Sequence, residues 1–88
     1  MKVRFKASFV TDLQAIKDKS LHQRVKALIA KVESAQSLLE IPNLKRLRGG
    51  GAFYRLRVGD HRVGLAVELD VVLFVRVLHR REVYRYFP

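Results

Sequence analysis

The chain has 88 residues and a mass of 10.2 kDa, which leaves room for one modest hydrophobic core and no second domain. Its 49% hydrophobic and 30% charged residues are typical of a folded globular protein, and the absence of cysteine excludes disulfides, cysteine zinc ligands and thiol nucleophiles. The formal charge of +10, from 18 Lys and Arg against 8 Asp and Glu, predicts a polyanionic partner.

No segment of the sequence suits a membrane or an export signal. The longest uninterrupted apolar run, Val71 to Val75, is far shorter than the roughly 20 residues of a spanning helix. The first residues alternate charged with apolar side chains and offer no continuous apolar stretch before a cleavage site. We therefore expect a cytoplasmic protein with no membrane partner.

The chain begins with a predicted strand and a short helix. Alternation from Lys2 to Lys6 indicates a strand that places Val3 and Phe5 on one face. Ser8 then precedes apolar residues at helical spacing, and a serine there is expected to cap a helix that ends near Lys17.

A longer helix is predicted from Ser20 to Leu38. The segment Ser20 to Gln23 has the form of a capping box, which marks the start of a helix. Apolar residues follow at steps of three, four and seven, as on the buried face of an amphipathic helix. This stripe comprises Leu21, Val25, Leu28, Ile29, Val32 and Leu39.

A basic loop is predicted from Asn43 to Gly51, because Pro42 prevents helical continuation and three glycines close the segment. The glycine run lacks the Lys-Ser or Lys-Thr pair and the helix start of a phosphate-binding loop. We therefore interpret it as a flexible connector. The basic residues of this loop are Lys45, Arg46 and Arg48.

Three strands rich in β-branched and aromatic residues are predicted next, from Ala52 to Val58, from His61 to Glu68 and from Val72 to Leu78. The expected order is one strand, two helices and an antiparallel three-stranded meander. This order predicts an α+β fold in which a helical hairpin packs on one face of a mainly antiparallel sheet.

The two hairpins of the meander fix which side chains share a face. A two-residue turn in the first hairpin, at residues 59–60, pairs Arg57 with Arg62. In the second hairpin, a two-residue loop would put Arg76 on the face of Val63, whereas a three-residue loop pairs Gly64 with Arg76. We choose the three-residue loop, residues 69–71, which also pairs Ala66 with Phe74.

That choice separates an apolar face from a basic one. The apolar face, which the helices can cover, gathers Tyr54, Leu56, Val58, Val63, Leu65, Val67, Leu73, Val75 and Val77. Like charges directly across a strand pair are destabilising, so the basic face needs compensation, which a bound polyanion supplies. Arginine binds phosphate bidentately through a planar fork of donors, so we interpret this face as a phosphate-binding surface. It carries Arg55, Arg57, Arg62 and Arg76.

Three segments resemble the RelE/ParE superfamily of toxins from toxin-antitoxin systems: Lys45 to Gly49 (KRLRG), Tyr54 to Val63 (YRLRVGDHRV) and His79 to Tyr84 (HRREVY). The resemblance extends over the whole chain in its length, its order of elements and its basic loop before the sheet. It implies a RelE-like mRNA interferase that cuts translated message in the A site of the ribosome. It also implies an antitoxin partner that is acidic at its binding segment.

The resemblance implies a set of site residues as well. The superfamily's basic catalytic positions fall on Arg55, Arg57 and Arg62 in the meander and on Arg80 after it, and its terminal tyrosine falls on Tyr84. The implied chemistry is metal-free attack of an RNA 2′-hydroxyl on the adjacent phosphate, whose growing charge Arg57, Arg62 and Arg80 would neutralise. Residues expected to bind RNA are Lys45, Arg46, Arg48, Arg55, Arg76 and Arg81.

The identity of the general base stays undecided. Some ribosome-dependent members have lysine where this chain has Arg55 and Arg57, and arginine cannot act as a base. Tyr84 either orients the nucleophile or stacks on a base, or instead anchors the C-terminal tail. The histidines lack metal-ligand spacing, so no metal and no cofactor is expected. The candidate bases, in order of preference, are His79, His61, and Glu68 or Glu82.

Two other functions share this fold and remain open. A ParE-like inhibitor of DNA gyrase would use the same scaffold, and a non-catalytic RNA-binding module would need only the arginine face. For the toxin, we expect the antitoxin to pack an amphipathic segment along the helices or the open sheet edge, with acidic residues toward the arginines. Operator DNA is expected to be contacted through the toxin-antitoxin complex.

Overall fold

The computed structural model describes residues 1–49 and 51–88. Five strands form one sheet in the order β1-β5-β4-β3-β2, with β1 parallel to β5 and the other neighbours antiparallel. The predicted α+β fold is confirmed. In chain order, the elements are β1 (Lys2–Phe5), α1 (Ala7–Ala15), α2 (Lys19–Ser34), the short 3-10 helix η1 (Leu38–Glu40), β2 (Leu44–Arg46), β3 (Phe53–Val58), β4 (His61–Glu68), β5 (Val71–His79) and α3 (Val83–Tyr86).

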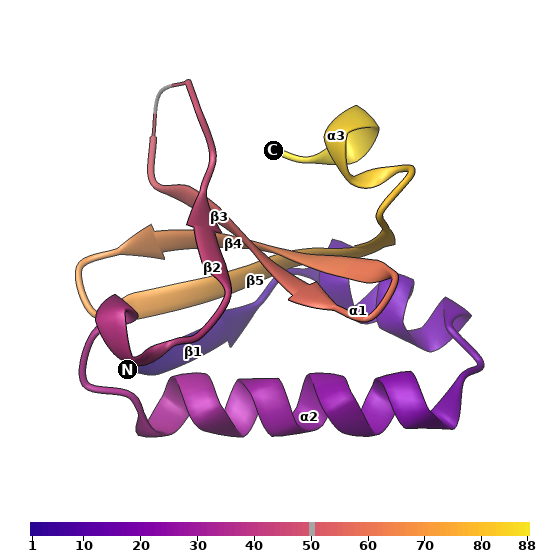
Figure 1. Ribbon diagram of the computed structural model, residues 1–88, viewed down its shortest axis with the longest axis horizontal. Helices are drawn as coiled ribbons and strands as arrows, with labels where there is room; N and C mark the ends of the chain where they lie inside the picture. The colour runs from indigo at the N-terminus through magenta and orange to yellow at the C-terminus, as the bar shows by residue number, and fades with distance from the viewer. Residues whose placement is uncertain (50) are drawn as a thin grey trace.

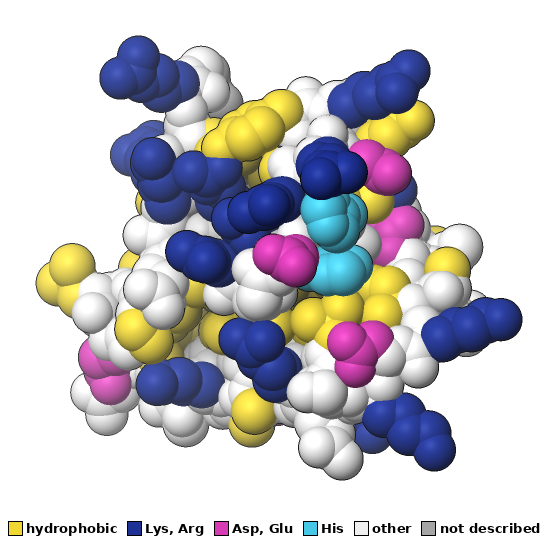
Figure 2. All heavy atoms as spheres, turned by 45° about the vertical axis from the view of Figure 1, so that its right-hand side comes forward, with side chains coloured by type: hydrophobic (Ala, Val, Ile, Leu, Met, Phe, Trp, Pro, Cys, Tyr) yellow, Lys and Arg dark blue, Asp and Glu magenta, His cyan; other side chains and the backbone are white. Residues whose placement is uncertain are grey.

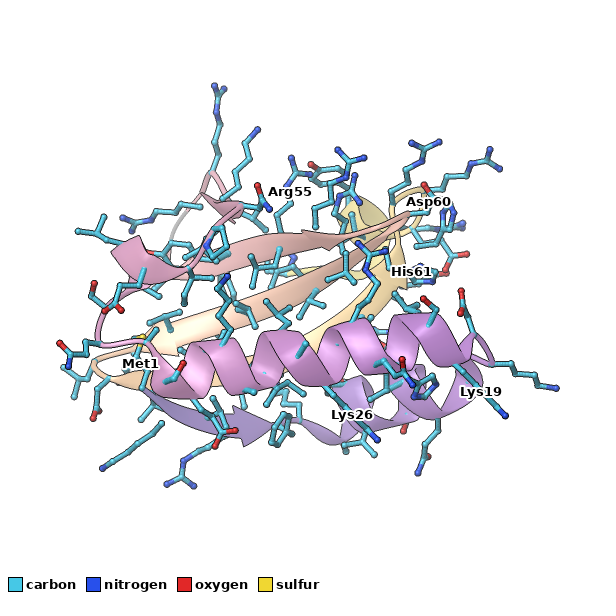
Figure 3. All side chains as sticks on the ribbon, turned by 60° about the horizontal axis from the view of Figure 1, so that its bottom comes forward. Met1, Lys19, Lys26, Arg55, Asp60 and His61 are labelled. Carbon is cyan, nitrogen blue, oxygen red and sulfur yellow. The ribbon has the colours of Figure 1, made fainter. Side chains whose placement is uncertain are left out.

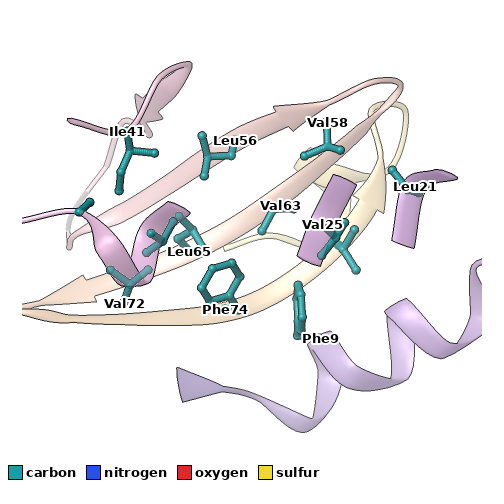
Figure 4. Close-up of a cluster of buried hydrophobic side chains, with 13 residues drawn as sticks. Phe9, Leu21, Val25, Ile41, Leu56, Val58, Val63, Leu65, Val72 and Phe74 are labelled. Atoms are coloured by element: carbon teal, nitrogen blue, oxygen red, sulfur yellow. The ribbon is translucent and has the colours of Figure 1, made fainter. Parts of the chain in front are cut away.

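The sheet separates two layers of unequal size (Figure 1). Helices α1 and α2 cover one face, and the main core lies between them and the sheet. It includes Phe9, Val25, Leu56, Val63 and Phe74, which are fully or almost fully buried (Figure 4). On the opposite face, α3 and the end of the chain cover a smaller cluster. Among the helices of residues 1–49 and 51–88, none has the length and apolarity that crossing a membrane requires.

Helix α1 completes the hydrogen bonding of β5 beyond the end of β1. The β1–β5 pairing stops at Phe74, and there the Ser8 hydroxyl donates to the Val75 carbonyl at 2.6 Å. The Asp12 carboxylate accepts from the Val77 N–H at 3.1 Å. The prediction that Ser8 caps α1 is therefore wrong. The N-cap is Lys6, without a side-chain cap, and Ser8 instead satisfies a strand carbonyl that would otherwise lack a partner.

Helix α2 starts and ends earlier than predicted. Asp18, not Ser20, is the N-cap, and its carboxylate accepts hydrogen bonds from the backbone N–H groups of Ser20 and Leu21. The backbone becomes extended at Ala35, so the chain turns back and buries Ile41 rather than continuing the helix. Leu39, expected on the buried stripe, is 97% exposed as a result.

The cap assignment has a direct test. Replacing Asp18 with alanine should lower the free energy of unfolding by about 1 kcal/mol, because two N–H groups at the start of α2 lose their acceptor. Ser20→Ala, the matched control, should change stability by no more than a few tenths of that. Urea denaturation of both variants measures the difference, and a larger loss for Ser20→Ala would contradict this cap.

The predicted basic loop contains a strand. Strand β2 pairs with β3 at the edge of the sheet, and Lys45 lies directly opposite Arg55. Loop residue 50 lies outside the described residues, so the predicted flexible connector is described only at its two flanking glycines. Sequence pattern missed β2 because it is a short edge strand with two charged side chains.

The first hairpin has the predicted register, and the second has it in part. Arg57 faces Arg62, and Gly64 faces Arg76, as expected. Near the turn, however, Ala66 pairs with Leu73, because the loop has two residues and a bulge between Gly64 and Leu65 restores the predicted pairing further on. A one-residue slip moves each side chain to the other face.

The two-residue loop therefore makes the predicted apolar face wrong at two positions of β5. Val72 and Phe74 face the helices and are fully buried, in place of Leu73 and Val75. Val75 instead packs against the smaller cluster on the opposite face, which is formed by Leu78, Val83 and Phe87 with Leu47 and Phe53.

Candidate nucleic-acid interface

The face of β3 and β4 that points away from the helices is strongly basic. Leu56 and Val58 enter the core, so the alternating side chains of Arg55 and Arg57 point to the opposite side. Arg62 joins them from β4. Figure 2 shows Lys and Arg side chains gathered over this part of the surface, and in Figure 3 Arg55 points away from α2. We call this surface the cationic face and define it as Lys45, Arg55, Arg57 and Arg62.

Two hollows of about 430 and 440 Å³ meet on the cationic face, because Lys45 and Arg55 line both. No described residue that lines either hollow is acidic. A groove with cationic walls and no carboxylate concentrates positive potential and attracts anions. The first hollow is lined by Asn43, Leu44, Lys45, Arg55, Arg57 and Arg62, and the second by Lys45, Arg46, Leu47, Arg48, Arg55, Tyr84, Phe87 and Pro88.

Arg62 is the most constrained arginine of this face. Its Nη1 donates to the carbonyls of Gly59, at 3.1 Å, and His61, at 2.9 Å, which holds the guanidinium against the hairpin turn. Partial burial, followed by the charges of Arg57, Arg55 and Arg80, lowers the pKa of Arg62 below its ordinary value. These like charges repel one another in the free protein, so a bound anion would stabilise the group.

Tyr84 stands at the rim of the groove. Its side chain is 65% exposed, and the guanidinium carbon of Arg55 lies 5.0 Å from its ring centroid. Val83 and Phe87, which are 1% and 3% exposed, hold the C-terminal segment against the sheet. Of the two roles weighed for Tyr84, the anchor is therefore filled by its neighbours, and Tyr84 is left free to contact a ligand.

Arg80 and Arg81 follow β5 beside the first hairpin turn. The Arg80 N–H donates to the Asp60 carbonyl at 2.7 Å, and its guanidinium lies 4.0 Å from the Asp60 carboxylate in an exposed ion pair. Arg80 is close enough to Arg62 to lower the pKa of that guanidinium. Arg81 is exposed. Arg80 thus extends the cationic face past the end of the sheet.

Arg76 is paired with a carboxylate and is therefore not a free cation like the arginines of the cationic face. It makes a bidentate pair with Asp12 of α1, with N–O distances of 2.7 and 2.9 Å, and this hydrogen bonding raises its pKa. Its guanidinium also lies 5.8 Å from the Tyr86 ring centroid. A carboxylate therefore balances Arg76, and it lacks the unbalanced charge that led us to predict RNA binding there.

The histidine pair lies on the helix-covered face. His61 and His79 are directly opposite each other, with ring centroids 5.5 Å apart, and they share their side of the sheet with Val63 and Val77. They line a hollow with the start of α2, and the His79 Nδ1 accepts from the Arg81 N–H at 3.2 Å. Their strand positions thus put both histidines on the side of the sheet opposite to that of Arg57 and Arg62.

The other two candidate bases line neither hollow of the cationic face. Glu68 lies at the far end of β4, beside an apolar hollow that Leu73 also lines, and Glu82 precedes α3. Across the described residues, no group of three or more His, Cys, Asp or Glu side chains is arranged to hold a metal ion.

We expect His61 to make the stability of the protein depend on pH. Burial, and then the neighbouring His79, lower the pKa of His61 below its ordinary 6.5. Unfolding restores the ordinary pKa, so the unfolded state binds more protons and the free energy of unfolding falls as the pH drops below 6.5. We expect a lower Tm at about pH 5.5 than at about pH 7.5, and a smaller difference in His61→Gln. An identical difference in the variant would assign the effect to other groups.

Two residues that shape the site were missed in the sequence. Asp12 neutralises Arg76 from a helix 64 residues away, and no local pattern signals that contact. Phe87 packs its ring on Gly64, between the rows of Arg55 and Arg76. An isolated glycine inside a strand pattern was the available signal, since it often marks close approach of another group to the backbone.

Comparisons with known proteins agree with this fold. A family model described as the ParE toxin of the type II toxin-antitoxin system parDE matches residues 3–84. The curated protein "Toxin RelE3" of Methanocaldococcus jannaschii is 38% identical over 89 residues, which span 100% of both chains.

Solved structures give the same result. The toxin in the RelB-RelE antitoxin-toxin complex from Methanococcus jannaschii superposes with a TM-score of 0.82 and 35% identity, covering 97% of this chain and 99% of that one. The archaeal RelE-RelB complex from Pyrococcus horikoshii OT3 gives a TM-score of 0.73 and 25% identity, with 90% and 93% covered. The chain therefore belongs to the RelE/ParE superfamily and is a toxin of a type II toxin-antitoxin system.

Proposed function

We propose that this toxin is a ribosome-dependent endoribonuclease that cleaves mRNA and thereby stops translation. The observation that carries the proposal is the groove of the cationic face, which joins six Lys and Arg side chains to an exposed tyrosine without a carboxylate among the described lining residues. Arginine forks bind phosphates, and an exposed aromatic ring stacks on an unpaired base. The groove thus suits single-stranded RNA with unpaired bases, such as mRNA that the ribosome holds in an extended form.

The proposed reaction is a transesterification within the RNA. The 2′-oxygen attacks the adjacent phosphorus and loses its proton, and the bond to the 5′-oxygen breaks as that oxygen gains a proton. The products are a 2′,3′-cyclic phosphate and a 5′-hydroxyl. Negative charge grows on the phosphate oxygens as the phosphorus becomes pentacoordinate, and fixed cations beside them lower the barrier. Arg57, Arg62 and Arg80 are the proposed source of that stabilisation.

Tyr84 completes the proposed site. Its ring stands beside Arg55 at the rim of the groove, where it can stack on a base next to the scissile phosphate and orient the 2′-hydroxyl. We do not extend the proposal to His79 as the base, because it lies on the helix-covered face. The proposed contribution of this chain is chiefly charge stabilisation and orientation.

A translating cell-free extract tests the proposal. Purified toxin is added to a translated message and to an untranslated copy of the same message, and new 5′ ends are mapped by primer extension. We expect cuts only in the translated copy, with Lys26→Ala, which removes one cation from the exposed side of α2, as active as wild type. Cuts in both copies would contradict the need for the ribosome, and cuts in neither would contradict cleavage.

A second candidate is inhibition of DNA gyrase, which the match to the ParE family model favours. A supercoiling assay with purified gyrase separates the two functions. Loss of supercoiling together with intact mRNA would replace the first proposal by the second. Intact mRNA and normal supercoiling, with measurable RNA binding through the cationic face, would instead indicate a non-catalytic RNA-binding module.

We also propose a cognate antitoxin as the protein partner, as in the RelB-RelE and RelE-RelB complexes of the relatives, and we propose that it is acidic because this chain is strongly basic. An antitoxin that places carboxylates on the cationic face would screen the arginines from RNA. The mixed complex would contact operator DNA chiefly through the antitoxin, with this chain's charge of +10 adding to the attraction.

Salt should weaken that complex. Raising salt from about 0.1 M to about 1 M shortens the Debye length from about 10 Å to about 3 Å and screens exposed charge pairs. We expect the Kd of the toxin-antitoxin pair, measured by calorimetry, to rise at least several-fold. A Kd that does not depend on salt would contradict the electrostatic part of this interface.

A further inference from the structure

Gly64 provides a seat for an aromatic ring on the open face of the sheet. It lies in the interior of β4, is buried, and stands between Arg55 on one side and Arg76 on the other. A Cβ atom at this position would lie 2.8 Å from Cδ1, Cδ2 and Cε1 of Phe87. The ring therefore lies directly on the backbone of β4, where every residue other than glycine would collide with it.

Phe87 is in turn the fixed end of the C-terminal segment. Its ring is 3% exposed and packs edge-on against Phe53, with centroids 5.7 Å apart. Its N–H donates to the Val83 carbonyl at 2.8 Å, which closes the single turn of α3. A helix of four residues is not stable by itself, so the position of α3 depends on the burial of Val83 and Phe87.

Tyr84 lies on that turn, between the two buried anchors. The seat beneath Phe87 is next to Arg55 in the sheet, and the Tyr84 ring stands over the Arg55 guanidinium at 5.0 Å. Raising Phe87 by the width of a methyl group would rotate or release the turn, and Tyr84 would leave the rim of the groove.

We propose that Gly64 and Phe87 are positioning residues for the cleavage reaction, and that they act by holding Tyr84 beside Arg55. This inference rests on the proposed function. Neither residue needs to touch RNA: Gly64 lies under the Phe87 ring, and the ring is buried. Displacement of a positioned group by about 1 Å can slow a reaction about 100-fold, so the seat would matter although it is remote from the chemistry.

Replacing Gly64 with alanine tests the proposal through its dependence on Tyr84. In the wild-type background, Gly64→Ala should slow ribosome-dependent cleavage by about 10- to 100-fold. In a Tyr84→Ala background, the same substitution should cause no further loss, because the group that it displaces is already absent. A loss of equal size in both backgrounds would mean that Gly64 supports the sheet in general, and would overturn the proposal.

Phe87→Leu is a second test of the proposal, to be used if the Gly64→Ala variant does not fold. Leucine keeps the position apolar but loses the flat ring, so this variant should fold, cleave more slowly, and show the same dependence on Tyr84. Wild-type cleavage rates in both variants would overturn the proposal.

Nuclear Overhauser contacts between the Tyr84 ring and the Arg55 side chain give a readout independent of cleavage. We expect them in the wild-type protein and not in either variant, whose remaining amide spectra should match the wild type. If the wild-type protein does not cleave translated mRNA, the proposed function is wrong, and these contacts still decide whether the seat holds Tyr84. Their persistence in both variants would overturn the inference alone.

Discussion

Arg62→Ala is expected to lower mRNA cleavage by about 100- to 1,000-fold, the usual effect of removing one preorganised donor from a developing oxyanion. Arg62 lies at the centre of the basic cluster, with Arg57 directly opposite it and Arg55 and Arg80 close enough to lower its pKa. It is also held by two carbonyls of the hairpin turn, so its guanidinium needs little reordering when RNA binds. Single-turnover cleavage of a translated message measures the loss.

Stability should change little in the same variant. Alanine removes two hydrogen bonds to the turn, but it also removes the repulsion between Arg62 and its three basic neighbours, and these effects oppose each other. Arg4→Ala is the matched control, because it removes an exposed arginine from the other edge of the sheet. Cleavage by Arg62→Ala equal to that by Arg4→Ala would show that Arg62 contributes only net charge.

Arg62→Lys separates charge from geometry. Lysine keeps the positive charge but lacks the planar fork, so it cannot hold the turn carbonyls and a phosphate oxygen together. We expect an activity between those of wild type and Arg62→Ala. Full activity of Arg62→Lys would indicate that charge alone is sufficient at this position.

The sequence was enough to place the arginines of β3 and β4, because a two-residue turn and strict alternation fix a face. Once Arg57 faces Arg62 and Leu56 is buried, Arg55 must lie on the open side. The same reasoning, had it been applied to His79, would have placed that candidate base on the covered side. His79 lies two residues after Val77 in β5, so the two side chains point to the same side of the sheet. The predicted pairing of Gly64 with Arg76 holds at that end of the hairpin.

The remaining features depend on contacts that no local pattern contains. The two-residue loop of the second hairpin places Leu73 and Val75 on the open face, and the bulge that restores the predicted register further on leaves no motif in the sequence. Strand β2 forms because β3 offers it an unpaired edge, despite its charged side chains. The turn that carries Tyr84 ends at Phe87, whose ring packs on a glycine 23 positions earlier in the chain.

Asp12→Asn is expected to cause the largest loss of stability, about 2–3 kcal/mol, because it leaves the charge of Arg76 without its carboxylate. The side chains of Arg76 and Asp12 are only 25% and 13% exposed, so water replaces the lost interaction poorly. Asp12 also accepts from the Val77 N–H at the end of the β1–β5 pairing, so one carboxylate serves both the ion pair and the sheet. In a domain of this size, the loss corresponds to a fall in Tm of roughly 10–20 °C.

Asp60→Asn is the control, since it breaks an ion pair that is exposed to solvent rather than partly buried. The Asp60 carboxylate lies 4.0 Å from the Arg80 guanidinium, and the two side chains are 70% and 54% exposed. Water screens such a pair, so its loss should cost no more than about 1 kcal/mol. Thermal unfolding of the two variants compares a partly buried, bidentate pair with an exposed one. Equal losses would mean that Asp12 contributes only surface charge, and that Arg76 is as available to an external anion as the arginines of the cationic face.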